Sequence, residues 1–446
     1  MRAGTHVGFT PEALEELSKR DGAYARLRAE AFEQFRTMPM PSPETEEWRY
    51  TDLREFDLSP FVPLALRPAA ATLDEVDPAL LEAVGALGER AGLAIQHDSS
   101  VVSVHLDPDL AQRGVVFSSL DEALQARPEL VDGRLHGIVP TGRTRFTALH
   151  GAFRSGGVLL YVPRDVRVEV PLQALTYLGR EDLAVFPHTL VVLEEGAEAT
   201  LIDRYVSPAL GRALSDAVVE LYLGPSSRLT YVALQDWGTG VTHLSVQRAV
   251  LSRDAELRSL AVAFGASLSR MEVESVLAED GGSSEMLGVY FARGRQHFDF
   301  RTIQDHVGNR TASDLLYKGA LKGRSRAVYS GTVIIEKDAH RCDAYQANRN
   351  ILLSDRAKAD SIPNLEILTN DPVRCGHAAS VGPVDEEALF YLQSRGIPYR
   401  EAERLIVFGF FQEVLDRVAL PEVRARLEDA IEKELETVED EEDHAG

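Results

Sequence analysis

Cysteine is scarce in this chain. Cys342 and Cys375 are its only two cysteines in 446 residues, too few for a disulfide framework. The first twenty residues contain no apolar segment of the kind that a secretory signal carries. The sequence also lacks the run of about 18 apolar residues that a membrane-spanning helix needs. Together these absences favour a cytoplasmic protein.

Positive charge is also in short supply. The chain has 47 Lys and Arg residues against 70 Asp and Glu residues, a net charge of −23. Phosphate backbones are bound by clustered Lys and Arg, and anionic membranes attract the same residues. We therefore expect neither a nucleic acid nor a membrane as a partner.

Several catalytic motifs are missing. The dipeptide Gly-Lys never occurs, so the chain has no P-loop for ATP. It has no GxGxxG after an expected strand, no GxSxG elbow and no HExxH pair. These absences favour a protein that is not an enzyme.

A short turn pattern recurs through the middle of the chain. It consists of an apolar residue, three mostly polar or turn-forming ones, and then a small or β-branched residue. It occurs as "VPRDVRV" at 162, "LEEGAEA" at 193, "LGPSSRL" at 223, "LSRDAEL" at 251, "LAEDGGS" at 277 and "IQDHVGN" at 303. A strand–turn–strand repeat with this spacing predicts a β-solenoid. An antiparallel sandwich with evenly spaced hairpins is the alternative.

Helical patterns flank the repeats. Residues 10–36 favour one helix capped by Thr10, with Pro11 at its first position. Beyond residue 384 a first helix ends at Gly396, and a second has an apolar face too wide for a surface helix. The acidic run at 428–443 is typical of a solvated end. We expect an N-terminal helical region (1–60), a connecting region of mixed structure (61–155), a β-helix core (156–384) and a C-terminal helical region with an acidic tail (385–446).

The stretch "RCGHAASVG" at 374–382 carries reactive side chains. On an extended strand Cys375 and His377 point to the same side. A structural zinc site needs four ligands, and an iron–sulfur cluster usually needs four cysteines. Other residues or a second chain would have to complete such a site, and the nearby candidates are Cys342, His297, His306 and His340. A buried free cysteine beside a hydrogen-bonded histidine is the alternative.

Three sequence blocks point to a family. "EEWRYTDL", "YQANRNILLSDRAKADSIPNLEILTNDPVRCGHAASVG" and "DEEALFYLQSRGI" together resemble the SufB/SufD family, the scaffold proteins of SUF iron–sulfur cluster assembly. The resemblance is close from about residue 300 to residue 418 and looser elsewhere. It implies a mostly β fold, a right-handed parallel β-helix with helical regions at both ends. The length, the first block and the Cys-x-His triplet are most similar to SufD.

The resemblance also implies partners and roles. A SufB-like protein pairs through the β-helices, and a SufC-like ABC ATPase docks on residues 386–418. No cofactor is intrinsic, but a transient iron–sulfur cluster forms at the SufB interface, where His377 takes part and the role of Cys375 is open. This chain reads His-Ala-Ala-Ser at 377–380, where the family commonly has His-Gly-Ala-Thr. The expected SufC contacts are Phe390, Tyr391, Arg395, Leu405, Phe408, Phe410 and Phe411, some of which must instead belong to the core.

Two other functions are compatible with these patterns. One is a SufB-like scaffold that forms a homodimer and carries a cluster itself. The other is a β-helix carbohydrate-active enzyme, such as a polysaccharide lyase or hydrolase. Such enzymes are usually secreted and present acidic clusters or aromatic rows along a groove, whereas this chain has only Trp48 and Trp237.

Overall fold

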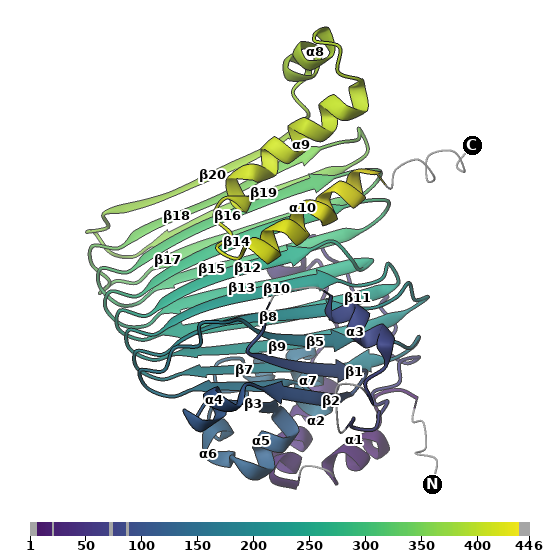
Figure 1. The fold of residues 1–446 in the computed structure, drawn as a ribbon, viewed down its shortest axis with the longest axis vertical. Coiled ribbons are helices and arrows are strands. Elements are labelled where there is room, and N and C mark those ends of the chain that lie inside the picture. Colours follow the sequence, from purple (N-terminus) through teal and green to yellow (C-terminus); the bar gives the residue numbers. More distant parts are fainter. Residues whose placement is uncertain (1–6, 20–21, 71–74, 86–88, 437–446) are drawn as a thin grey trace.

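The computed structural model describes residues 7–19, 22–70, 75–85 and 89–436. Its centre is a parallel β-solenoid in which the chain alternates between two facing sheets, confirming the solenoid prediction (Figure 1). Each strand pairs with the equivalent strand of the next coil. Glu198 thus lies opposite Arg228 and Asp343 opposite Arg374. This parallel register excludes the antiparallel sandwich.

The two sheets are named here sheet I and sheet II. In spatial order, sheet I consists of β2 (Ser100–Leu106), β1 (Gly92–His97), β5 (Leu172–Tyr177), β8 (Glu198–Val206), β10 (Arg228–Asp236), β12 (Glu256–Ala263), β14 (Ser283–Ala292), β16 (Ala312–Leu321), β18 (Asp343–Leu352) and β20 (Arg374–Pro383). Sheet II consists of β19 (Lys358–Ile367), β17 (Arg326–Ile335), β15 (His297–His306), β13 (Leu268–Leu277), β11 (Val241–Leu251), β9 (Ala213–Leu223), β7 (His188–Leu193), β4 (Val158–Val162) and β3 (Val116–Ser119), with β6 (Ala184–Val185) pairing β9.

The interior between the sheets is apolar along most of its length and becomes partly polar near its end. Leu, Val and Ala side chains fill the first coils, and stacked aromatic rings follow. The ring centroids of Tyr290 and Phe300 are 4.5 Å apart. Near the last coils the interior contains amides, and Gln346 on β18 accepts a hydrogen bond from the hydroxyl of Tyr329 at 2.9 Å. Buried amides of this kind require partners, and Tyr329 supplies one.

Short helices gather at the N-terminal end of the solenoid (Figure 1). They are α1 (Pro11–Ser18), α2 (Ala25–Thr37), α4 (Pro108–Gln112), α5 (Leu120–Ala126), α6 (Pro128–Val131) and α7 (Arg145–Phe153). Helix α3 (Pro78–Val84) lies apart from them beside sheet I, where its Val84 carbonyl accepts a hydrogen bond from Gln173 of β5 (Figure 1). The Thr10 hydroxyl caps α1, as predicted. The single helix expected over 10–36 is wrong, because a 3-10 turn at Gly22–Tyr24 separates α1 from α2. The break lets Leu17 and Phe35 enter the same apolar cluster.

The block "EEWRYTDL" fastens the N-terminal region to sheet II. The Trp48 ring packs under the guanidinium of Arg270, 3.9 Å from its centroid, and Arg270 also donates to the Glu47 carbonyl at 2.9 Å. The Thr51 hydroxyl donates to the Asp299 carboxylate at 2.7 Å. Because Arg270 and Asp299 lie on β13 and β15, this block holds two neighbouring strands.

Three helices follow the last strand: α8 (Glu386–Ser394), α9 (Tyr399–Leu415) and α10 (Pro421–Glu436). Gly396, with φ of 88°, ends the first of them as predicted. Helices α9 and α10 lie across the outer face of sheet I, whereas α8 projects beyond β20 (Figure 1). The expectation of a solvated end from 428 is wrong as far as residue 436, because Ile431 on α10 is buried against the sheet. Residues 437–443 of that run lie outside the described residues.

No helix within the described ranges has the length and apolar character that crossing a membrane requires.

Candidate partner surface at the last coil

The last coil leaves a free edge on each sheet. β20 ends sheet I and β19 ends sheet II, and within the described residues neither has a strand on its outer side. An edge strand presents unpaired N–H and C=O groups to any strand that approaches. Pro363 lacks an N–H and interrupts the donor row of β19. β20 carries proline only at its last residue, Pro383, so its edge is the better template for strand addition.

Cys375 and His377 lie side by side on this edge. They pair with Ala344 and Gln346 of β18, whose side chains point into the solenoid: Ala344 packs with residues of β17, and the Gln346 amide donates to the Asn364 carbonyl of β19 at 3.0 Å. Cys375 and His377 therefore share the inner face, as strand alternation predicts. Cys375 is half-buried, and burial raises the pKa of its thiol. His377 is exposed.

Apolar side chains surround the same edge. Val381 on β20 is 41% exposed, Val373 just before it 64%, and Leu368 just after β19 58%. Isolated exposed apolar residues are ordinary, but a group at one end of a molecule indicates an interaction surface. The last coil thus combines free backbone groups, exposed apolar side chains and the Cys-x-His triplet.

The other histidines considered from the sequence do not join this triplet. His306 is buried, with its two ring nitrogens 2.7 Å from the hydroxyls of Thr311 and Ser313. His297 contacts the Thr51 hydroxyl at 2.9 Å. Cys342 is fully buried and accepts a hydrogen bond from Thr311 at 3.2 Å.

The expected SufC contacts divide into exposed and buried residues. Phe390 and Tyr391 on α8 are 73% and 57% exposed, and the Arg395 guanidinium stacks on the Tyr391 ring at 5.1 Å. Leu405 on α9 is 44% exposed. Phe408 and Phe410 are partly buried against sheet I. Phe411 is fully buried, so its role is packing and it is not available for docking.

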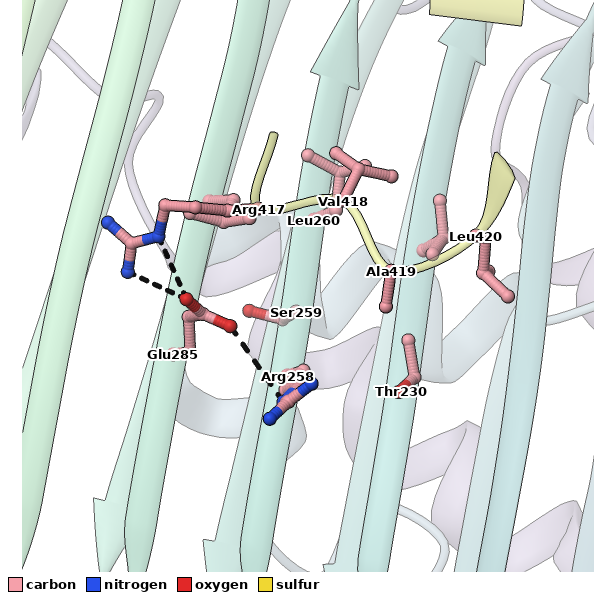
Figure 2. Close-up of a pocket in the computed structure, with 11 residues that line it drawn as sticks. Thr230, Arg258, Ser259, Leu260, Glu285, Arg417, Val418, Ala419 and Leu420 are labelled. Atoms are coloured by element: carbon pink, nitrogen blue, oxygen red, sulfur yellow. Dashed lines mark hydrogen bonds and ion pairs between the residues drawn. The ribbon is translucent and has the colours of Figure 1, made fainter. Parts of the chain in front are cut away.

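The α9–α10 connection is anchored firmly on sheet I. Arg417 donates to Glu285 at 2.7 Å and to Asp314 at 2.5 Å, on two neighbouring strands. Figure 2 shows this guanidinium reaching Glu285 while Val418 and Leu420 lie over the apolar side chains of the sheet. Because α9 is held at this end, the projecting α8 is carried on a fixed support.

One cluster of buried histidines is not among the sites expected from the sequence. Within the described part of the chain, the only group of three potential metal ligands is His136, His150 and His188, all of them buried. No motif signals it, because the three residues are widely spaced and come from a loop, a helix and a strand. Only the packing of α7 on the sheet brings them together.

Comparisons with known proteins agree with the sequence blocks. The family description "SUF system FeS cluster assembly, SufBD core domain" matches residues 176–410, and "SufBD protein N-terminal region" matches residues 15–174. An iron-sulfur cluster assembly SufBD family protein of Mycobacterium tuberculosis is 41% identical over 317 residues, covering 69% of this chain and 78% of that protein. The iron-sulfur cluster assembly protein SufD of Bacillus subtilis is 29% identical over 444 residues, covering 98% of this chain and 100% of that protein.

Proposed function

Since the chain belongs to the SufBD family of iron–sulfur cluster assembly proteins, we propose that it is the SufD-type member of a cytoplasmic SufB–SufC–SufD complex. The observation that carries this proposal is the free edge of β20 beside the Cys-x-His triplet. The full-length similarity to the Bacillus subtilis SufD supports the choice of family member. The protein acts as a scaffold component and not as an enzyme.

The β20 edge would receive the SufB-like partner. A strand of the partner's β-helix adds to the edge, so that backbone hydrogen bonds continue from one solenoid into the next. The exposed Val373 and Val381 side chains, near the two ends of β20, supply apolar contacts to the new strand pair. Pairing at this edge places Cys375 and His377 directly at the junction between the two chains.

His377 is the ligand that this chain offers to a forming cluster. Its imidazole is exposed on the edge, and neutral imidazole is a good ligand for iron. Cys375 is less suited, because burial raises the pKa of its thiol and metals bind the thiolate. A cluster needs more ligands than one histidine, so the partner chain contributes the remaining ones, and the cluster is transient and shared.

Helix α8 would receive the SufC-like ATPase. It projects beyond the solenoid (Figure 1) and exposes Phe390 and Tyr391. Aromatic side chains are frequent anchors of protein interfaces. Because α9 is fastened to sheet I through Lys318, whose ammonium donates to the Phe410 carbonyl at 2.7 Å, movement of the ATPase would be transmitted to the coils beneath.

The test is co-expression with the SufB-like and SufC-like proteins of the same organism. The variant His377→Ala is compared with wild type and with His340→Ala, a control that removes an exposed histidine from the turn before β18. We expect all three to form the complex and only His377→Ala to lose cluster, followed by complex size and visible absorbance. Full cluster content in His377→Ala would refute the site assignment.

An experiment on the chain purified alone distinguishes a SufD-type protein from a SufB-like homodimeric scaffold. A SufD-type chain should stay colourless after incubation with iron and sulfide. A SufB-like homodimeric scaffold would instead take up a cluster under the same conditions. Failure of wild type to form a complex with either partner would contradict the proposal as a whole.

A further inference from the structure

Three histidines meet inside the molecule where the N-terminal region packs on the solenoid. His136 lies in the loop after α6, His150 on α7, and His188 at the start of β7. His150 and His188 are fully buried, and His136 is 8% exposed. One ring nitrogen from each lies within 4.8 Å of the other two. We call these residues the three-histidine cluster.

The outward-facing nitrogen of each ring meets an oxygen acceptor. The contacts are His136 Nδ1 to the Val139 carbonyl at 3.2 Å, His150 Nδ1 to the Asp216 carbonyl at 2.9 Å, and His188 Nε2 to the Glu220 carboxylate at 3.0 Å. A carbonyl can only accept, so the hydrogens of His136 and His150 are fixed on Nδ1. In metal sites, histidine ligands almost always donate their second N–H in this way.

Glu220 connects the loop of His136 with the ring of His188. It accepts backbone N–H groups from His136 at 2.6 Å, from Ile138 at 2.9 Å and from Val139 at 2.8 Å. The Glu220 carboxylate also lies 3.0 Å from His188 Nε2. A carboxylate beside the second ring nitrogen is a usual partner of a metal-binding histidine and holds the ring hydrogen on that nitrogen.

Each of the three inward-facing nitrogens then carries a lone pair and no hydrogen. His150 Nε2 and His188 Nδ1 face each other at 3.2 Å with no hydrogen between them. His136 Nε2 is buried without a hydrogen-bond partner among the described residues. A cation at their centre would satisfy all three lone pairs.

The separation between two of the three rings suits a tetrahedral metal ion. Zinc binds histidine nitrogen at about 2.0–2.1 Å, which places two nitrogens on one ion about 3.3 Å apart. The 3.2 Å between His150 Nε2 and His188 Nδ1 is close to that value. Arg154, four residues after His150, is paired with Asp121 at 2.9 Å. Its charge is therefore partly compensated.

We propose that His136, His150 and His188 bind one divalent transition-metal ion of the zinc class. The proposal is independent of cluster assembly at the last coil. His136 and His150 belong to the part matched by the N-terminal family description, whereas His188 belongs to the part matched by the core description. The ion would thus join the two parts, with a small ligand such as water in its fourth position, and would act as a structural centre.

The test uses the full-length chain produced in minimal medium with cobalt as the probe metal. We expect about one ion per chain, as for a single structural site, measured by elemental analysis after dialysis against a chelator. The visible spectrum should be that of tetrahedral cobalt, without a sulfur-to-metal charge-transfer band. Retention of the metal by Cys375→Ala would separate this site from the Cys-x-His triplet.

The variant His136→Gln should lose the metal. Its matched control is His243→Gln, since His243 is also buried with an unpartnered Nε2 but lies outside the cluster. If His136→Gln does not fold, the metal content of the wild-type protein still tests the proposal. Wild type without metal would overturn the proposal. In that case a proton on Glu220 would let His188 carry its hydrogen on Nδ1 and donate it to His150 Nε2. Loss of metal in Cys375→Ala or in His243→Gln would also overturn it.

Discussion

Replacing Arg270 with methionine tests how the "EEWRYTDL" block is held to the solenoid. The Arg270 side chain is 3% exposed and that of Asp299 is fully buried, with their charged atoms 2.5 Å apart. Methionine keeps much of the side-chain volume that packs against the Trp48 ring but removes the charge. The Asp299 carboxylate then loses its closest ionic partner in a fully buried site.

The expected loss of stability follows from that burial. Breaking a buried ion pair by removing one partner costs about 3–5 kcal/mol. Asp299 keeps Arg301 at 3.0 Å and the Thr51 hydroxyl at 2.7 Å, which places the expected loss near the lower end, about 3 kcal/mol. The double variant with Asp299→Asn should recover part of it, because the unpaired charge is then absent.

Urea unfolding followed by circular dichroism measures these differences, and the dependence on pH gives a second check. Burial alone would raise the pKa of Asp299, but Arg270 and Arg301 together hold it below its ordinary value. The pair therefore stabilises the fold above the ordinary carboxyl pKa of about 3.9 and loses that effect as pH falls through the lower folded value. Arg270→Met should weaken this acid dependence. A loss within about 1 kcal/mol, the range of surface pairs, would refute the reasoning.

Three further predictions concern the C-terminal helices. Phe411→Ala should lower the free energy of unfolding by about 3–5 kcal/mol because the ring is fully buried, whereas the exposed Phe390→Ala should change it by less than about 0.5 kcal/mol in the same urea titration. Burial raises the pKa of Glu434 to about 7 despite Arg293 at 2.8 Å. Its contribution is therefore complete below the ordinary glutamate pKa and is lost as pH rises through about 7, so Glu434→Gln should flatten the melting temperature between about pH 5 and pH 8. Gly409→Ala should raise stability by about 0.5–1 kcal/mol, since its Cβ would meet nothing within 4 Å on α9; a lower melting temperature would contradict this.

The solenoid could be predicted because its signal is local and repeated. Each coil needs a turn between two short strands, and the turn residues recur at almost constant spacing. The failures lie where packing outweighs local pattern. The acidic residues of α10 read as a solvated run, yet Val423, Leu427 and Ile431 form a stripe that is buried on sheet I. The spacing of four between these apolar residues indicates a helix with one buried face, but the surrounding acidic residues favour the interpretation as a solvated end.

The candidate sites differ in the same way. Cys375 and His377 share a face because side chains alternate along any strand, so their geometry follows from two positions in one short segment. The three-histidine cluster depends on α7 packing against β7 and β9, where His150 meets the Asp216 carbonyl. Such a contact depends on the tertiary fold and leaves no spacing in the sequence by which it could be recognised.

The two ends of the solenoid are built differently, and this difference supports a partner at the last coil. At the N-terminal end, β2 and β3 pair antiparallel with β1 and β4 and end the parallel stack, and short helices cover that end (Figure 1). Repeat proteins need such terminal caps, because an open coil exposes unpaired backbone and apolar side chains. At the other end β20 has no such strand within the described residues, and α9 and α10 cover the flank of sheet I instead of its edge. A second chain bound along β20 would therefore complete the fold and bring its ligands to His377 in the same contact.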